Sequence, residues 1–192
     1  MRELVRSLIR SLEAGRELIV CQVVETKGST PQKAGAMMLV DPEGGQVGTL
    51  GGGCVENEVK LKALRRFGQT GAEIHAFVLD HDYAWADGLI CGGKMVIAVE
   101  SARSDQALAY YRAYRDRLEA GTGYTEAIVV EPGQLEKSVL GGRCLFDAEG
   151  RPVASWNAET VIDRIAARLQ PLADRPKPGV RAGVALLPTL PR

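Results

Sequence analysis

The chain has 192 residues and carries 24 Lys and Arg residues against 24 Asp and Glu residues, so its formal net charge is zero. A chain without a basic excess lacks the electrostatic footprint of a nucleic-acid-binding protein, and its apolar runs are shorter than the ~20 residues that cross a bilayer. We therefore expect no nucleic-acid partner, no integral membrane segment and a cytoplasmic location.

The first half of the chain predicts one amphipathic helix and then strands separated by glycine-rich turns. Leu4, Val5, Leu8 and Leu12 recur at the i, i+3, i+4 spacing of a helix, and Gly15 is a suitable residue to end it. The second and third strands are expected to form a hairpin. The expected elements are a helix at 3–13, strands at 18–24, 36–40 and 46–50, a helix at 55–67, strands at 74–79 and 94–99, and a loop at 80–88.

The second half of the chain predicts two further helices and two further strands. Ser104 or Asp105 is expected to cap the first of these helices. The residues after 170 are rich in Pro, Gly and Arg. Hairpins and strand-to-helix units occur together, which favours an α/β fold with a mixed β-sheet flanked by helices. The expected elements are helices at 104–119 and 158–169, strands at 125–130 and 139–146, a domain at 1–170 and a C-terminal connector at 171–192.

The strongest functional signal is the run Gly51-Gly52-Gly53-Cys54, which lies between a predicted strand and a predicted helix. Glycine backbone and the N–H groups of a helix N-terminus form a place where an anion such as phosphate can bind. Cys54 in the first helical turn is expected to have a lowered pKa and to act as a nucleophile, a sulfur carrier or a soft-metal ligand. The alternative is a tight turn with a buried cysteine, and the two interpretations are about equally weighted.

A second thiol stands beside paired glycines at Cys91-Gly92-Gly93. Alone it indicates a structural turn, but together with Cys54 it suggests two loops that face one ligand. The loop Lys27-Gly28-Ser29-Thr30-Pro31 offers a cation and hydroxyls to a phosphate, with a Ser/Thr turn as an equally weighted alternative.

The remaining cysteines and the histidines give weaker signals. Cys21 and Cys144 fall in predicted strands and are expected to be core thiols, and His75 is expected to be structural. A zinc site made by Cys54, Cys91 and His81 is weakly indicated, because short Cys-x-x-Cys pairs are absent.

Four motifs in the same order resemble the XdhC/CoxI family of xanthine dehydrogenase accessory proteins. They are Gly28-Ser29-Thr30-Pro31, Gly35-Ala36-Met37-Met38-Leu39-Val40, Gly48-Thr49-Leu50-Gly51-Gly52-Gly53-Cys54-Val55-Glu56 and Leu89-Ile90-Cys91-Gly92-Gly93.

The resemblance implies that the chain binds the molybdenum cofactor (molybdopterin) as cargo, protects it while a terminal ligand is exchanged for sulfur, and delivers it. The implied partners are a xanthine-dehydrogenase-type molybdoenzyme and a cysteine desulfurase, and self-association into a homo-oligomer is left open. Cys54 and Cys91 are the expected contacts to molybdenum or its sulfur. The cofactor-binding residues expected on this basis are Ser29, Thr30, Gly51, Gly52, Gly53, Cys54, Glu56, Cys91, Gly92 and Gly93.

Two further expectations concern the second domain of the family and an enzymatic alternative. Longer relatives continue into a Rossmann-like domain through a proline-containing connector, which Leu186-Leu187-Pro188-Thr189-Leu190-Pro191-Arg192 resembles. By itself, Val184-Ala185-Leu186-Leu187-Pro188 is typical of either a strand or a connector. The alternative function is a sulfur-transfer or redox enzyme that uses Cys54. It is disfavoured because no general base is evident: Glu56 lies two residues away and faces a different side of a helix.

Overall fold

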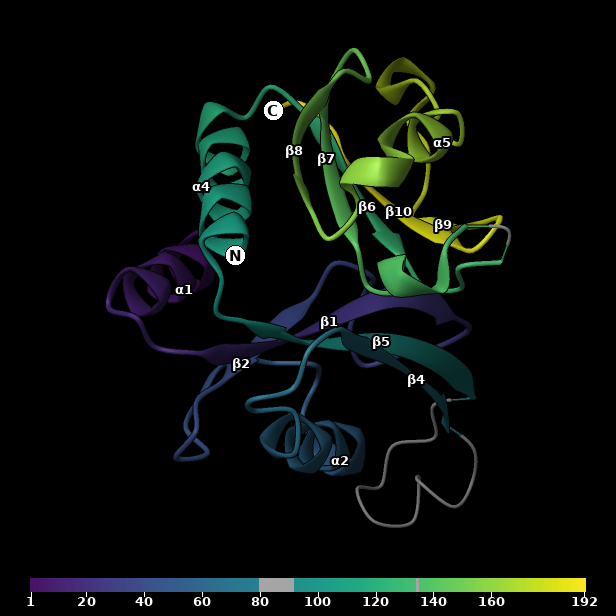
Figure 1. Ribbon diagram of the computed structural model, residues 1–192. Coiled ribbons are helices and arrows are strands. Elements are labelled where there is room, and N and C mark those ends of the chain that lie inside the picture. Colours follow the sequence, from purple (N-terminus) through teal and green to yellow (C-terminus); the bar gives the residue numbers. More distant parts are fainter. Residues whose placement is uncertain (80–91, 134) are drawn as a thin grey trace.

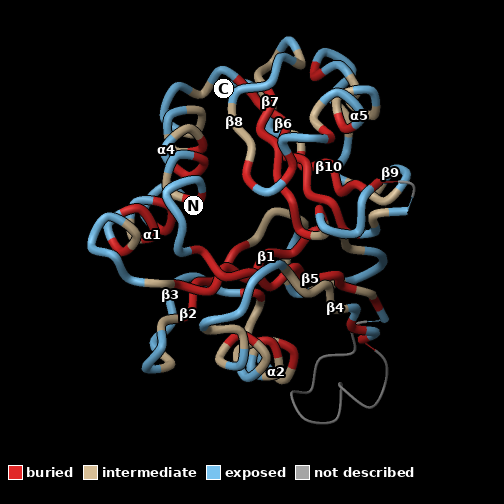
Figure 2. Tube along the Cα trace, viewed as in Figure 1, coloured by how far each residue is buried: buried red, intermediate tan, exposed pale blue. Residues whose placement is uncertain are grey.

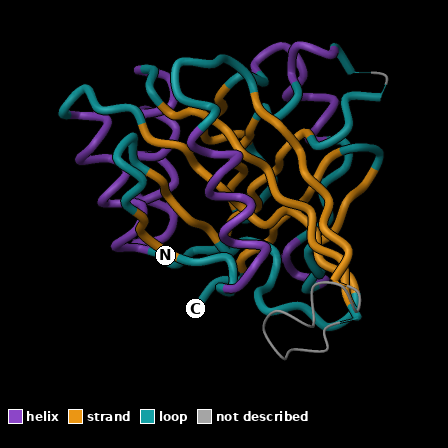
Figure 3. The backbone as a smooth tube through the Cα atoms, turned by 90° about the horizontal axis from the view of Figure 1, so that it is seen from below, coloured by secondary structure: helices purple, strands orange, loops and turns teal. Residues whose placement is uncertain are grey.

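The computed structural model describes residues 1–79, 92–133 and 135–192 and shows two β-sheets packed face to face, with helices around them (Figures 1 and 3). The first sheet has the strand order β3-β2-β1-β5-β4 and the second has the order β8-β7-β6-β10-β9. All described strand pairs are antiparallel. The α/β class is confirmed, although the strands are divided between two antiparallel sheets instead of forming one mixed sheet.

The elements of the first half follow the expected order, with small shifts at their ends. The predicted helices and the predicted β2–β3 hairpin are confirmed, and the strands on either side extend further than expected. These elements are α1 (Arg2–Glu13), β1 (Leu18–Lys27), β2 (Met37–Val40), β3 (Gln46–Gly48), α2 (Gly53–Leu64), β4 (Ala72–Leu79) and β5 (Gly93–Ala102).

The second half departs more from expectation. The Oγ atom of Ser104 accepts the backbone N–H of Ala107 at 3.1 Å, which confirms this residue as the cap of α4. The described elements are α4 (Asp105–Ala120), β6 (Tyr124–Val129), the 3₁₀ turn η1 (Lys137–Val139), β7 (Arg143–Asp147), β8 (Pro152–Trp156), η2 (Glu159–Val161), α5 (Ile162–Ala166), η3 (Leu172–Asp174), β9 (Gly179–Arg181) and β10 (Val184–Thr189).

This half differs from expectation in several details. The strand β8 was not predicted, and the helix expected at 158–169 is reduced to η2 and the short helix α5. The strand expected from Val139 begins only at Arg143, because Gly141 adopts a positive φ of 80° and turns the chain first. The segment expected as a connector provides β9 and β10, and β10 pairs with β6 along its whole length. This segment is therefore part of the second sheet.

Side chains alternate between the two faces of each strand, and this explains which layers pack against the first sheet. The odd-numbered apolar residues of β1 and β5, such as Cys21 and Ile97, pack under α2, whereas even-numbered residues such as Val24 and Val96 face the second sheet. The outer face of the second sheet packs against α5, and α1 and α4 close one side of the molecule (Figure 1). Buried residues are accordingly concentrated in the strands (Figure 2).

A buried polar cluster lies between the two sheets, and we call it the inter-sheet cluster. Arg143 is fully buried, and its Nε and Nη1 atoms donate to Glu100 and Glu126 at 3.0 and 3.1 Å. Gln22 donates to the second oxygen of Glu126 at 2.7 Å, and the Tyr110 hydroxyl donates to the first at 2.9 Å. Burial raises the pKa of Glu100, although the adjacent guanidinium opposes this. The cluster ties β1 and β5 to β6 and β7.

Candidate functional site

The glycine loop leads from β3 into α2 and is held by a conformation that only glycine adopts easily. The φ angles of Gly51, Gly52 and Gly53 are 112°, 76° and 69°. Side chains with a Cβ atom are strained at such angles. Leu50, directly before the loop, is buried beneath α2. The predicted strand-to-glycine-to-helix turn is therefore confirmed.

Cys54 is the second residue of α2, and its side chain is half-buried. The prediction that it lies in the opening turn of a helix after a glycine loop is confirmed. A thiol at this position is close to the positive end of the helix dipole and is neither sealed in the core nor fully in solvent.

Glu56 holds the glycine loop together. Its Oε2 atom accepts hydrogen bonds from the Thr49 hydroxyl at 2.6 Å, from the N–H of Leu50 at 2.6 Å and from the N–H of Gly52 at 3.0 Å. Its Oε1 atom accepts one from Gln46 at 2.8 Å. Burial would raise the pKa of this carboxyl, but the four hydrogen bonds outweigh it and hold the pKa below its usual value.

The backbone donors that precede α2 therefore have partners within the chain. Leu50 and Gly52 donate to Glu56, and Gly51 donates to the Thr49 hydroxyl at 2.9 Å. The sequence led us to expect that loop donors would hold an anion from outside. In the structure, the side chain of Glu56 takes that place, and the supporting residues Gln46 and Thr49 were not singled out from the sequence.

Three motif segments meet at this end of the first sheet. A Cβ atom placed on Gly51 would lie 2.6 Å from Cβ of Pro31, and one on Gly28 would lie 2.9 Å from the carbonyl oxygen of Gly92. A Cβ atom on Gly93 would overlap the carbonyl oxygen of Ser29. These backbone approaches require glycine and bring residues 28–31, 51–54 and 92–93 side by side.

The loop at 28–31 carries two hydroxyls, those of Ser29 and Thr30, which differ in their surroundings. Thr30 donates its hydroxyl to the carbonyl oxygen of Gln32 at 2.8 Å, so this hydroxyl already has a partner within the loop. Ser29 is exposed. Cys91 and His81, which the sequence also indicated, lie outside the described residues.

The two remaining described cysteines are core residues. Cys21 is completely buried beneath α2, and Cys144 is buried beneath α5. Burial raises the pKa of each thiol to about 12. Both predictions are confirmed. His75 lies within β4 and pairs with Glu73 at 3.0 Å.

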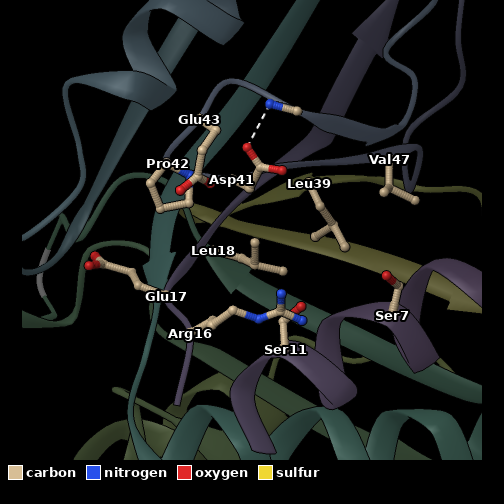
Figure 4. Close-up of a pocket in the computed structure, with 11 residues that line it drawn as sticks. Ser7, Ser11, Arg16, Glu17, Leu18, Leu39, Asp41, Pro42, Glu43 and Val47 are labelled. Carbon is tan, nitrogen blue, oxygen red and sulfur yellow. Dashed lines mark hydrogen bonds between the residues drawn. The ribbon is translucent and has the colours of Figure 1, made fainter. Parts of the chain in front are cut away.

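Among the cavities formed by the described residues, two lie at a distance from the glycine loop, and no described residue that the sequence predicted for the site lines either of them. The smaller, about 150 Å³, lies between α1, the start of β1 and the β2–β3 turn, where Asp41 accepts the N–H of Gly45 at 2.6 Å (Figure 4). The larger, about 620 Å³, reaches Glu100 of the inter-sheet cluster and is bordered by Trp156 and Asn157. Glu100 is seven residues along β5 from Gly93, about 23 Å at the usual rise of a strand.

Within residues 1–79, 92–133 and 135–192, no three His, Cys, Asp or Glu side chains are grouped as metal ligands. None of the described helices has the length and apolar character that a membrane crossing demands.

Part of the chain is similar to known proteins of one family. Residues 11–78 match the model of the XdhC and CoxI family. The chain is 31% identical over 126 residues to a Bacillus subtilis protein named as a probable xanthine dehydrogenase subunit, and 30% identical over 120 residues to the Escherichia coli protein named molybdenum cofactor insertion chaperone PaoD. Each alignment covers 62% of this chain but only 37% and 36% of those relatives, so the chain spans about a third of their length.

A solved structure shares the fold. The chain described as a xanthine dehydrogenase from Bacillus halodurans matches with a TM-score of 0.65, over 98% of this chain and 53% of that one. At 19% sequence identity, this likeness shows the fold alone.

Proposed function

We propose that the chain is an accessory protein of the XdhC and CoxI family, whose model residues 11–78 match, and that it binds the molybdenum cofactor as cargo. In this role it protects the cofactor while a terminal ligand is exchanged for sulfur and delivers it to a xanthine-dehydrogenase-type molybdoenzyme. A cysteine desulfurase is the proposed sulfur source. A relative named as an insertion chaperone for the same cofactor supports this assignment.

The observation that carries the proposal is the meeting of the three glycine-containing segments beside Cys54. A Cβ atom on Gly52 would have no heavy atom within 4 Å, so a ligand can approach the backbone there. The thiol two residues later is a soft donor, which suits molybdenum or a transferable sulfur. Cys54, Gly51, Gly52 and Gly53, with Ser29 and Gly92 at the neighbouring loops, are the proposed binding residues.

A binding role is favoured over an enzyme that uses Cys54 as its nucleophile. Such an enzyme needs a base that can accept the thiol proton. The carboxylate of Glu56 is held by four hydrogen bonds within the loop and has a lowered pKa, so it is poorly suited to that task.

The test is anaerobic gel filtration of the purified protein mixed with molybdenum cofactor released from a molybdoenzyme. We expect molybdenum and pterin fluorescence to elute together with the protein, and the same cofactor run without protein serves as the control. Elution of both at the small-molecule volume, with a protein that circular dichroism shows to be folded, would contradict the proposal.

A further inference from the structure

The proposed cargo has two chemically different ends, and the carboxylate of Glu56 occupies the glycine loop in which one of them could bind. One end is a phosphate, and the other is a molybdenum atom held by sulfur. Resting on the proposed function, we propose that Glu56 is a specificity-determining residue that keeps the phosphate out of the glycine loop. The loop and Cys54 are thereby left to the metal end of the cargo.

The backbone N–H donors of the glycine loop are sterically blocked by Glu56. Successive backbone N–H groups in left-handed turns form a concave nest that binds anions. Here the nest already contains a carboxylate oxygen, because Oε2 of Glu56 lies 2.6 Å from the Leu50 nitrogen and 3.0 Å from the Gly52 nitrogen. An incoming phosphate oxygen would need the same position.

The negative charge of Glu56 also opposes the binding of a phosphate. Glu56 lies in the first turn of α2, where an acidic side chain offsets the positive end of the helix dipole. Its hydrogen bonds favour the ionised form, so the carboxylate remains negative at neutral pH. A phosphate dianion approaching the start of α2 therefore meets a fixed negative charge in place of the usual attraction.

The open side of Gly52 and the half-buried Cys54 remain accessible at the start of α2. Gly52 has open space on the side where a Cβ atom would stand, and Cys54 is half-buried at the start of the helix. A soft thiol beside open backbone suits a metal or sulfur group, and a hard phosphate gains little there. The structure thus favours one orientation of the cargo.

The test uses inorganic phosphate as the probe and the backbone amide signals of Leu50 and Gly52 in ¹H–¹⁵N spectra as the readout. We expect no saturable shift of these signals in the wild type. In Glu56→Ala the nest is vacated, and both signals should shift saturably at phosphate concentrations roughly tenfold or more below the highest at which the wild type shows no saturation. Glu58→Gln is the matched control, because it removes an equal charge one half-turn later on α2.

Each outcome bears on the proposal. Saturable shifts of Leu50 and Gly52 in the wild type would overturn it, as would a folded Glu56→Ala variant that ignores phosphate. Glu56→Gln, which removes the charge but keeps the size, should respond in the same direction more weakly and serves if the alanine variant does not fold. These spectra involve no cofactor, so failure of cofactor retention would refute the proposed function without deciding this point.

Discussion

The inter-sheet cluster and the glycine loops are both polar regions, but they are stabilised in opposite ways. The cluster is sealed between two sheets, and Arg143 pairs there with Glu100 and Glu126. The glycine loops lie at the open end of the first sheet and are held by backbone approach and by the carboxylate of Glu56. The comparison shows that the buried charges serve the fold, whereas the glycine loops and the half-buried Cys54 are partly exposed, where the proposed ligand would bind.

The largest expected effect is a loss of protein stability when the inter-sheet cluster loses its arginine. Arg143→Met would leave two carboxylates buried without their cation, which costs about 3–5 kcal/mol of unfolding free energy. Urea unfolding at pH 7 would measure this. Arg151→Met, which removes an arginine from an exposed pairing with Asp147, is the control and should change little. Equal losses for the two variants would remove the distinction between the cluster and surface charges.

A smaller loss of stability is expected where the loops approach one another. Gly93→Ala would place a Cβ atom against the carbonyl oxygens of Ser29 and Lys27, and such overpacking costs about 1–3 kcal/mol. Gly92→Ala is the matched control, because its Cβ atom would have nothing within 4 Å and should cost no more than ~0.5 kcal/mol. Urea unfolding of the two adjacent variants checks this, and similar midpoints would show that the segments are not tightly packed.

A weaker effect is expected in the pH dependence of stability. The folded state lowers the pKa of Glu56, so this group stabilises the protein above the usual glutamate pKa and that contribution is lost as the pH falls through the lowered value. Glu56→Gln should therefore flatten the decline in unfolding free energy between neutral and acid pH. Glu58→Gln, which leaves the hydrogen bonds of the glycine loop in place, is the control. If the unfolding free energy of Glu56→Gln falls with pH as steeply as that of the wild type, the hydrogen bonds of Glu56 do not contribute to the pH dependence of stability.

The sequence predicted the local elements well and their assembly less well. Periodicity located α1, and the glycine run correctly placed Cys54 at the start of α2. Division into two sheets depends on long-range pairing, such as β10 with β6, which local pattern does not encode. The segment of β10 resembled a connector because it contains Pro188, which the structure accommodates within the strand.

The polar contacts were the least predictable part of the site. Glu56 was identified as a ligand-binding residue, but its partners Gln46 and Thr49 lie ten and seven residues earlier, and only the turn of the loop brings them together. The inter-sheet cluster did leave a signal in the sequence. Gln22, Glu100, Glu126 and Arg143 all interrupt otherwise apolar strands at inward positions.

The central claim is that Cys54 contacts the cofactor, and the most direct test compares cofactor retention by the wild type, Cys54→Ala and Cys21→Ala on anaerobic gel filtration. Removal of the half-buried thiol should leave circular dichroism unchanged but abolish or strongly weaken retention of molybdenum. Cys21→Ala changes a fully buried thiol away from the loops and, in the folded protein, should retain cofactor as the wild type does. Equal retention by the wild type and a folded Cys54→Ala variant would contradict the account.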